Sequence, residues 1–294
     1  MTVIELIERC SARLEEAGVS FGHGTTNAFD EAAWLVLWAM KQPLDALEDV
    51  AESTMPAAAE QRALDLVEQR IATRRPAAYL TGEAWLQGVP FTVDERVIVP
   101  RSLIAECLAD GTIDAWLSDR TQQVLDLCTG NGSLAVLAAM AWPDVQVTGA
   151  DLSADALAVA TLNVRRHELV DRITLVQGDG LAAVAGRRFD LILCNPPYVN
   201  AESMAALPPE YRAEPEMALS GNLAGGTDGM DFIRPLLAQA ADHMTDDAVL
   251  VLEIGHERTF FEAAFPRLEA VWLPTSAGDD QVLLLTRAAL EAAR

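Results

Sequence analysis

The sequence predicts an α/β fold: a seven-stranded, mostly parallel sheet with helices on both faces, preceded by a small helical domain and a β-hairpin linker. Three observations support it. After about residue 105, apolar runs typical of strands alternate with helical stretches. The first 75 residues have helical periodicity and almost no strand signal. Between them, short β-like runs are broken by Gly and Pro. We therefore expect a helical domain over 1–75, a linker over 76–105 and an α/β domain over 106–294.

The N-terminal residues contain three helical patterns. "MTVIELIERCSARLEEAG" predicts an amphipathic helix, not a secretion signal. "FDEAAWLVLWAM" is apolar on nearly all sides, so we expect a buried helix. "PAAAEQRALDLVEQRIATRR" predicts a further helix, with Pro56 in its first turn. The following "AYLTGEAWLQGVPFTVDERVIVPRS" predicts the hairpin linker.

The α/β part contains seven candidate strands. They are "QVLDLC", "VQVTGAD", "ITLVQ", "FDLILC", "AVLVLEI", "AVWL" and "QVLLLT". Helical stretches lie between them, notably over 133–141, 154–167 and 229–243. No long helix separates the last two strands, so we expect those two to pair antiparallel.

Composition excludes several classes of protein. Half of the 294 residues are hydrophobic, which is enough for a large core. No apolar run reaches the roughly 18 residues that cross a bilayer, so no membrane partner is expected. The four cysteines form no CxxC pair and the four histidines show no metal spacing, which predicts a reduced, cytoplasmic protein without a metal site.

The net charge is strongly acidic. Twenty-one basic and 44 acidic side chains give −23, which argues against direct binding to a phosphate backbone. Two interpretations of the acidity remain open. The charge could steer a basic partner towards the protein, or it could be a general adaptation to solubility or salt.

A glycine loop follows the first strand of the α/β part. In "VLDLCTGNGSLAVLAAMA", Gly130 and Gly132 lie in a tight turn between strand and helix. Glycine permits positive φ and lets a ligand approach the backbone, and this edge of a sheet is the usual ligand crevice. The spacing is not G-x-G-x-x-G and no Walker lysine is present. Alone, the loop is equally compatible with a structural turn.

Acidic residues end the next two strands. Asp151 is placed to accept hydrogen bonds from both ribose hydroxyls of an adenosine ligand. Alternatively it is a surface or capping residue, although Ser153 or Asp155 could cap the next helix. Asp179 ends the third strand, where it could bind an adenine amino group or simply form a turn.

The fourth strand ends in Asn195-Pro196-Pro197-Tyr198, within "FDLILCNPPYVN". With the glycine loop and the acidic strand ends, this order resembles the S-adenosylmethionine-dependent methyltransferases. Asn-Pro-Pro-Tyr is the signature of those that methylate a planar amino or amide nitrogen. Many members have a further glycine where this chain has Cys128.

Three longer segments sharpen the resemblance. "FGHGTTNAFDEA", the linker and "LPPEYRAEPEMALSGNLAGGTDGMDFIRPLLAQA" resemble the glutamine-N5 protein methyltransferases over essentially the whole chain. They are most similar to the branch specific for large-subunit ribosomal protein L-three. The branch that modifies release factors typically has Pro-Arg-Pro-Glu-Thr where this chain has Pro-Arg-Ser-Leu-Ile, starting at Pro100.

The resemblance implies a Rossmann-like methyltransferase fold, S-adenosylmethionine as cofactor, S-adenosylhomocysteine as product and no metal. It implies a basic ribosomal protein as substrate, recognised by the helical domain. Catalytic residues would be Asn195, Pro196 and Tyr198, and Pro197 would join them in binding substrate. The implied cofactor site comprises Asp126, Cys128, Thr129, Gly130, Asn131, Gly132, Asp151, Leu152, Asp179, Gly180 and Asn195, with Pro100 and Arg101.

The Asn-Pro-Pro-Tyr turn suits the chemistry that this resemblance implies. An amide nitrogen is a poor nucleophile because its lone pair is delocalised. The Asn195 side-chain oxygen and the Pro196 carbonyl could accept both amide hydrogens and aim the lone pair at the methyl group. The prolines add rigidity, and the Tyr198 ring can pack on the flat amide. No strong general base is required.

Three functions remain open at this point: a glutamine methyltransferase acting on a ribosomal protein or a release factor, an adenine-N6 methyltransferase, and a binding protein without catalysis. The acidic charge weakens the second, and the intact motif weakens the third. Three further residues also have two interpretations. His23 is either a structural loop residue or a substrate contact. Arg101 and Glu106 either close over the methionine end of the cofactor or pair with each other.

Overall fold

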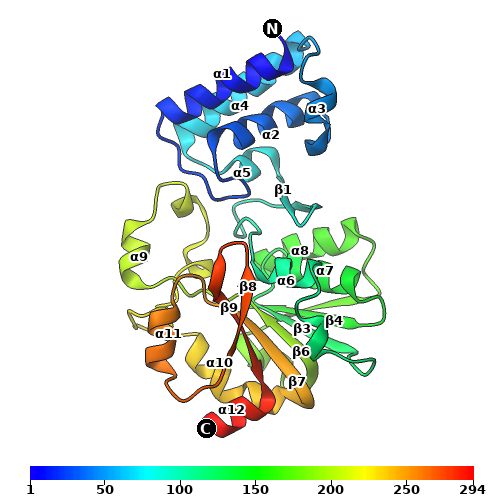
Figure 1. The fold of residues 1–294 in the computed structure, drawn as a ribbon, viewed down its shortest axis with the longest axis vertical. Helices are drawn as coiled ribbons and strands as arrows, with labels where there is room; N and C mark the ends of the chain where they lie inside the picture. The colour runs from blue at the N-terminus through cyan, green and yellow to red at the C-terminus, as the bar shows by residue number, and fades with distance from the viewer.

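The computed structural model describes residues 1–294, with a helical region above and a sheet covered by helices below (Figure 1). The helical region contains five helices. They are α1 (Val3–Glu16), α2 (Ala28–Met40), α3 (Leu47–Val50), α4 (Ala57–Thr73) and α5 (Ala77–Thr81). Thr2 and Glu5 form a reciprocal capping box at the start of α1, which satisfies backbone N–H groups that lack a helical partner. Pro56 is the N-cap of α4, one position before the first turn predicted for it.

Helix α2 is the centre of the helical region, because it packs against α1, α4 and α5. Its buried side chains lie on nearly all sides and include Trp34, Leu35, Val36 and Leu37, as the sequence predicts. The apolar core around it continues through the hairpin to Val159 of α8 (Ala154–Arg166), a helix that covers the sheet. The helical region and the sheet are therefore joined by packed side chains as well as by the chain itself.

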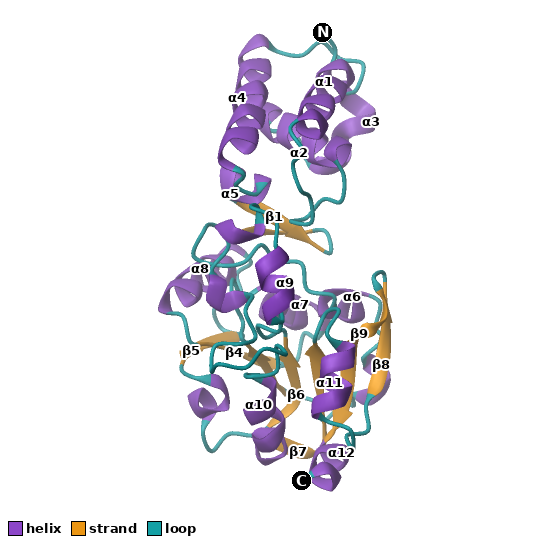
Figure 2. Ribbon diagram, turned by 90° about the vertical axis from the view of Figure 1, so that its left-hand side faces the viewer, coloured by secondary structure: helices purple, strands orange, loops and turns teal.

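The hairpin lies between the two parts (Figure 2). Strands β1 (Glu83–Leu86) and β2 (Val89–Thr92) pair antiparallel around a two-residue turn. Gln87 and Gly88 both have positive φ, 49° and 74°, which is the backbone of a type I′ turn and matches the twist of the strands.

Seven strands form the main sheet in the order β5-β4-β3-β6-β7-β9-β8. The first five in this order are parallel, and β9 pairs antiparallel with both β7 and β8, which confirms the predicted topology. The strands are β3 (Gln123–Leu127), β4 (Gln146–Asp151), β5 (Ile173–Gln177), β6 (Phe189–Cys194), β7 (Met244–Glu253), β8 (Val271–Thr275) and β9 (Gly278–Thr286).

Helices cover both faces of this sheet. One apolar cluster joins it to α6 (Ile104–Ala109), α7 (Ser133–Ala141) and α8 (Ala154–Arg166). Another joins the opposite face to α10 (Ile233–Gln239), α11 (Arg258–Ala264) and α12 (Arg287–Ala293). The short helix α9 (Ala201–Ala206) follows β6. The chain reverses its direction across the sheet between β3 and β6, and such a switch point leaves a crevice at the carboxyl ends of the strands.

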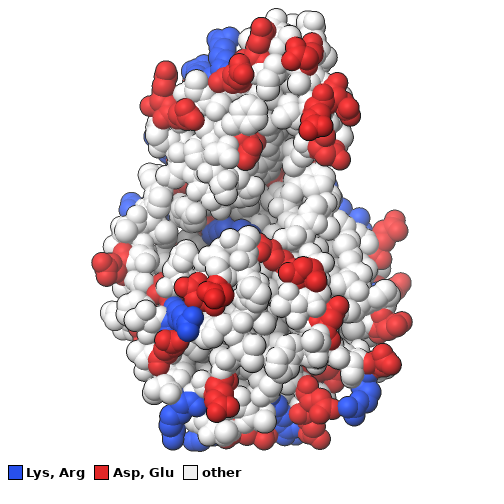
Figure 3. Space-filling model, viewed as in Figure 1, with Lys and Arg blue, Asp and Glu red and all other residues white.

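Acidic side chains are spread over the surfaces of both parts in the view of Figure 3, and Lys and Arg are fewer. No helix is long and apolar enough to cross a membrane.

A buried ionic cluster joins the helical region to the segment after β6. The Arg70 side chain is fully buried and donates from Nε to Glu31 Oε1 at 2.8 Å. It donates from Nη2 to the Ser20 carbonyl at 2.8 Å, and its Nη1 lies 3.5 Å from Glu210 Oε1. Burial raises the pKa of Glu31, and the Arg70 charge opposes this rise. Arg70 therefore compensates two carboxylates that would be costly to bury alone.

Replacing Arg70 should destabilise the protein strongly. Arg70→Met leaves Glu31 and Glu210 buried without this partner, so we expect the free energy of unfolding to fall by about 3–5 kcal/mol. Urea unfolding followed by circular dichroism measures the change. Arg13→Met is the control: it removes a partly exposed pair with Glu68 and should cost less than about 1 kcal/mol. Equal costs for the two variants would show that the buried cluster adds no special stability.

Candidate active site

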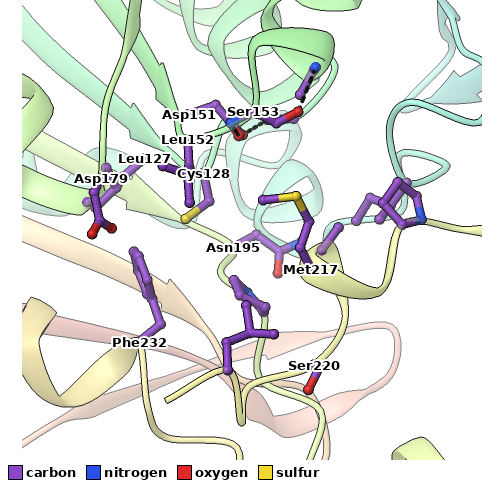
Figure 4. A pocket seen from close by; sticks show the side chains of 18 of the residues that line it. Leu127, Cys128, Asp151, Leu152, Ser153, Asp179, Asn195, Met217, Ser220 and Phe232 are labelled. Atoms are coloured by element: carbon purple, nitrogen blue, oxygen red, sulfur yellow. Dashed lines mark hydrogen bonds between the residues drawn. The ribbon is translucent and has the colours of Figure 1, made fainter.

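A cavity of about 400 Å³ opens at the carboxyl ends of the parallel strands. Its walls come from four successive strand ends, because these ends meet at one edge of the sheet. Of the residues predicted for the site, the lining includes Cys128, Gly130, Asp151, Leu152, Asp179, Gly180, Asn195 and Pro197. Figure 4 shows Asp179 and Phe232 at one end, Asp151 and Cys128 between, and Asn195 and Met217 at the other end.

The other predicted residues lie outside the lining. These are Pro100, Arg101, Asp126, Thr129, Asn131, Gly132, Pro196 and Tyr198. Several of them, including Asp126 and Arg101, bind the loops and segments that form the cavity wall. The distinction matters because a residue that only holds a loop affects binding through the position of that loop.

Asp126 fixes the glycine loop. Its side chain is 1% exposed, and Oδ2 accepts hydrogen bonds from the Thr129 hydroxyl and from the Ala135 backbone N–H at 2.9 Å. Burial raises the pKa of Asp126 to about 7, although both hydrogen bonds lower it. The carboxyl group therefore connects the loop to the first turn of α7 without facing the cavity.

The glycine loop has left-handed backbone at three alternate positions, 128, 130 and 132. Gly132 has φ 80°, and a Cβ there would lie 3.1 Å from Cβ of Ala160, so glycine allows α7 and α8 to pack closely. Gly130 has φ 54° and lines the cavity. Cys128 has φ 61°, a conformation that costs a non-glycine residue about 1–3 kcal/mol. This backbone explains why glycine suits the position in related loops.

Asp151 connects the second strand end to the glycine loop. Its Oδ2 accepts from the Gly130 N–H and its Oδ1 from the Ser153 N–H, both at 2.9 Å. Burial raises the pKa of Asp151, and these backbone hydrogen bonds oppose the rise. Ser153 is the N-cap of α8, so Asp151 is not needed for that role. The next residue, Leu152, leaves 52% of its surface exposed beside the cavity.

Asp179 and Phe232 border the far end of the cavity. Asp179 is exposed after β5, and Phe232 stands across from it at the start of α10 (Figure 4). Phe232 could not be predicted from the sequence, because one aromatic residue before an apolar helix carries no signal of a ligand. Its position depends on how α10 packs beside the strand ends.

The Asn-Pro-Pro-Tyr turn forms the opposite end. Asn195 is half-buried and points into the cavity, and no hydrogen bond joins it to the other residues drawn in Figure 4. Pro196 is buried and Pro197 lines the cavity. The Tyr198 ring instead lies against Gly255, where a Cβ would come within 2.6 Å of it. The Tyr198 hydroxyl donates to Glu253 Oε1 at 3.2 Å. In this conformation the amide of Asn195, and not the phenol, faces the cavity.

A segment over 208–221 closes the Asn195 end of the cavity and contributes Pro215, Met217 and Ser220 to it. Buried Glu214 fixes the segment to the linker: its two oxygens accept from Arg101 at 2.6 and 2.7 Å, and Oε1 also accepts from the Val99 N–H at 2.8 Å. Burial alone would raise the pKa of Glu214, but the Arg101 charge and the neighbouring His23 ring lower it to about 2.

These contacts show the partners of three residues whose roles the sequence left open. Arg101 pairs with Glu214, whereas Glu106 accepts hydrogen bonds from the backbone and hydroxyl of Ser276, so Arg101 and Glu106 do not pair with each other. His23 is 1% exposed, lies 3.4 Å from Glu214 and packs beside the Tyr211 ring. It is therefore a structural residue in this conformation. The structure contains no group of three or more His, Cys, Asp or Glu side chains arranged to hold a metal.

Comparison with solved structures gives the fold. The hMettl16 catalytic domain, in complex with MAT2A 3'UTR hairpin 1, matches 87% of this chain and 91% of its own with a TM-score of 0.55 at 14% identity. A methyltransferase from Pyrococcus furiosus matches 77% of this chain and 98% of its own with a TM-score of 0.50 at 16% identity. At these identities the likeness concerns the fold alone, and it agrees with a Rossmann-like methyltransferase sheet.

Comparison of sequences gives the family. Residues 106–207 match the family model of the methyltransferase small domain. Proteins named ribosomal protein uL3 glutamine methyltransferase are similar over nearly their whole length. The one from Bordetella pertussis is 52% identical and covers 97% of this chain and 95% of its own. The one from Burkholderia pseudomallei is 50% identical, covering 99% and 96%. With this identity over this length, the chain belongs to the family of the ribosomal protein uL3 glutamine methyltransferases.

Proposed function

We propose that this methyltransferase transfers a methyl group from S-adenosylmethionine to the side-chain amide nitrogen, N5, of a glutamine in ribosomal protein uL3. S-adenosylhomocysteine is the other product. One observation carries the proposal: the acidic strand ends and the Asn195 amide open into the same cavity. A nucleotide site and an acceptor for a planar amide are therefore adjacent. The relatives' names support uL3 over a release factor, and the charge of −23 argues against an adenine substrate.

The lining suits S-adenosylmethionine. The carboxylates of Asp151 and Asp179 can accept hydrogen bonds from ribose hydroxyls and from an adenine amino group. Leu152 and Phe232 offer apolar surface to an adenine ring, and binding would cover the exposed Leu152 side chain. A volume of about 400 Å³ lies in the usual range for a cofactor site. When bound, the cofactor supplies the methyl group on a positively charged sulfur.

Asn195 and Pro196 would orient the glutamine. The Asn195 side-chain oxygen and the Pro196 carbonyl accept the two hydrogens of the glutamine amide, which favours a pyramidal nitrogen with its lone pair available. Because both acceptors belong to a turn with two prolines, they need little reorganisation during the reaction. This is catalysis by orientation and electrostatics, and it leaves no step for a strong base.

The substrate would be recognised as a basic protein. Ribosomal proteins carry Lys and Arg to neutralise RNA phosphates, and this chain carries −23. The surface of the helical region in Figure 3 is rich in acidic side chains. We propose that residues 1–75 form part of the recognition surface, that 76–105 link it to the catalytic domain over 106–294, and that the enzyme acts in the cytoplasm.

The cofactor site can be tested at Asp151. Asp151→Ala removes a charged acceptor, so affinity for S-adenosylhomocysteine should fall by about 1.5–3 kcal/mol. Isothermal titration calorimetry measures it. Asp155→Ala is a matched control, because Asp155 is an exposed carboxylate only four residues away, in the first turn of α8, and does not line the cavity. Unchanged affinity in Asp151→Ala would remove this residue from the site.

The catalytic amide can be tested at Asn195. Asn195→Ala should lower kcat by about two to three powers of ten, as the loss of one preorganised polar group often does. Calorimetric affinity for the cofactor product should change much less. Asn195→Asp keeps a hydrogen-bond acceptor but adds a negative charge. Comparing it with Asn195→Ala separates the effect of losing the acceptor from the effect of changing the charge. Parental turnover by Asn195→Ala on a glutamine substrate would contradict the mechanism.

The substrate can be tested by methyl transfer at two salt concentrations. Purified uL3, purified release factor and assembled large subunits are compared. Free uL3 should be labelled best, because RNA covers its basic surface within the subunit. Labelling should slow as salt rises, since the Debye length shortens from about 10 Å at 0.1 M to about 3 Å at 1 M. Preferential labelling of the release factor would overturn the substrate assignment and leave the methyltransferase activity intact.

A further inference from the structure

The phenol of the Asn-Pro-Pro-Tyr turn has a buried partner that lies on another strand. Glu253 is the last residue of β7, which runs beside β6, and Leu252 is the register partner of Cys194. The Glu253 side chain is 3% exposed, and its Oε1 accepts from the Tyr198 hydroxyl at 3.2 Å. The carboxylate therefore lies directly behind the turn that presents Asn195 to the cavity.

The other oxygen of Glu253 is held by the last residues of the linker. Oε2 accepts from the Ser102 hydroxyl at 2.6 Å and from the Leu103 backbone N–H at 2.9 Å. Burial raises the pKa of Glu253, and these hydrogen bonds and the one from Tyr198 oppose the rise. Because both oxygens accept hydrogen bonds, the carboxylate has a fixed position relative to α6.

The backbone behind Tyr198 is shaped to receive its ring. Gly255 has φ 52°, and a Cβ at this position would lie 2.6 Å from Tyr198 Cε2. Glycine is therefore needed there both for the left-handed backbone and for the close approach of the ring. The hydrogen bond to Glu253 and the contact with Gly255 together hold the Tyr198 ring outside the lining of the cavity.

Holding Tyr198 also holds Asn195. Only Pro196 and Pro197 separate the two residues, and each proline ring fixes its own φ. At its other end the turn is joined to the parallel strand β6 at Cys194. The turn is thus fixed on both sides, by sheet pairing before Asn195 and by the Glu253 contact after it. Because Pro196 and Pro197 are rigid, a shift of Tyr198 would also shift the Asn195 amide.

We propose that Glu253 is a positioning residue for methyl transfer: it fixes the Tyr198 phenol to Ser102, two residues before α6, and thereby sets the direction of the Asn195 amide. The proposal rests on the function proposed above, in which Asn195 orients the glutamine. Tyr198 in this arrangement acts mainly from behind the turn. Glu253 touches neither substrate nor cofactor.

The test is a double-mutant cycle with Glu253→Gln and Tyr198→Phe. Glutamine keeps the size of the side chain but removes its charge. Its NH2 group must either face the Leu103 N–H, which cannot accept, or donate to the Tyr198 hydroxyl and reverse that hydrogen bond, so the charge-assisted contact with the phenol is lost in both orientations. Phenylalanine keeps the ring and removes only the hydroxyl. Each single variant should lower kcat on uL3 about tenfold to a hundredfold, because small misplacements of a reacting group have effects of this size. The double variant should be about as slow as the slower single variant.

Two further measurements distinguish positioning from general damage. Calorimetric affinity for S-adenosylhomocysteine should stay within about twofold of the parent in all three variants. Hydrogen exchange of the cofactor-free protein should speed up at the amides of Val199 and Asn200 in both single variants. This second measurement does not depend on activity, so it tests the contact even if uL3 proves not to be the substrate.

Asp190→Asn is the matched control. Asp190 lies at the opposite end of the same sheet, where its oxygens likewise accept from three donors: the backbone N–H groups of Gln122 and Gln123 and the hydroxyl of Thr245. Its replacement should leave kcat and the exchange of 199–200 unchanged. Additive losses in the cycle, parental kcat in Glu253→Gln, or the same kcat loss in Asp190→Asn would each overturn the proposal. Parental protein that fails to methylate uL3 would instead count against the proposed function.

Discussion

Parallel pairing of β4, β3 and β6 is the constraint on which the site depends. Parallel strands end at one edge, so Asp151, the glycine loop and Asn195 meet there although they are far apart in the chain. The reversal of strand order between β3 and β6 leaves the crevice open. A nucleotide and an amide substrate can therefore be placed next to each other without a dedicated domain for each.

Buried carboxylates hold the loops around this crevice. Asp126 fixes the glycine loop to α7, Glu214 fixes the segment over 208–221 to the linker, and Glu253 lies behind the Asn-Pro-Pro-Tyr turn. Glu257 similarly accepts from the side chain and backbone of Asn200. In each case a carboxylate accepts from several donors at once, so one side chain can order a stretch of irregular backbone. Part of the acidity of this chain thus has a structural role.

Contacts of the same kind connect the helical region to the wall of the cavity. Glu210 accepts from Arg74 and from the Ser20 N–H, while Glu214, four residues later, binds Arg101 of the linker. The segment that carries both glutamates supplies Met217 to the cavity wall. A substrate that docks on the helical region would therefore meet a surface that is continuous with the wall of the active site. This continuity suits an enzyme that must place one side chain of a large protein.

The sequence by itself determined the strands, half of the twelve α-helices, the hairpin and the family, because period-two and period-3.6 patterns, turn glycines and the Asn-Pro-Pro-Tyr turn are local signals. It also placed Asp151, Asp179 and Asn195 at strand ends. Only the tertiary structure decided the partners of Arg101 and Tyr198 and the place of Phe232. Arg101 binds a residue 113 positions away and Tyr198 one 55 positions away, and such pairs leave no periodic trace. They arise from how the linker, β7 and α10 pack around the turn, which is a property of the whole fold.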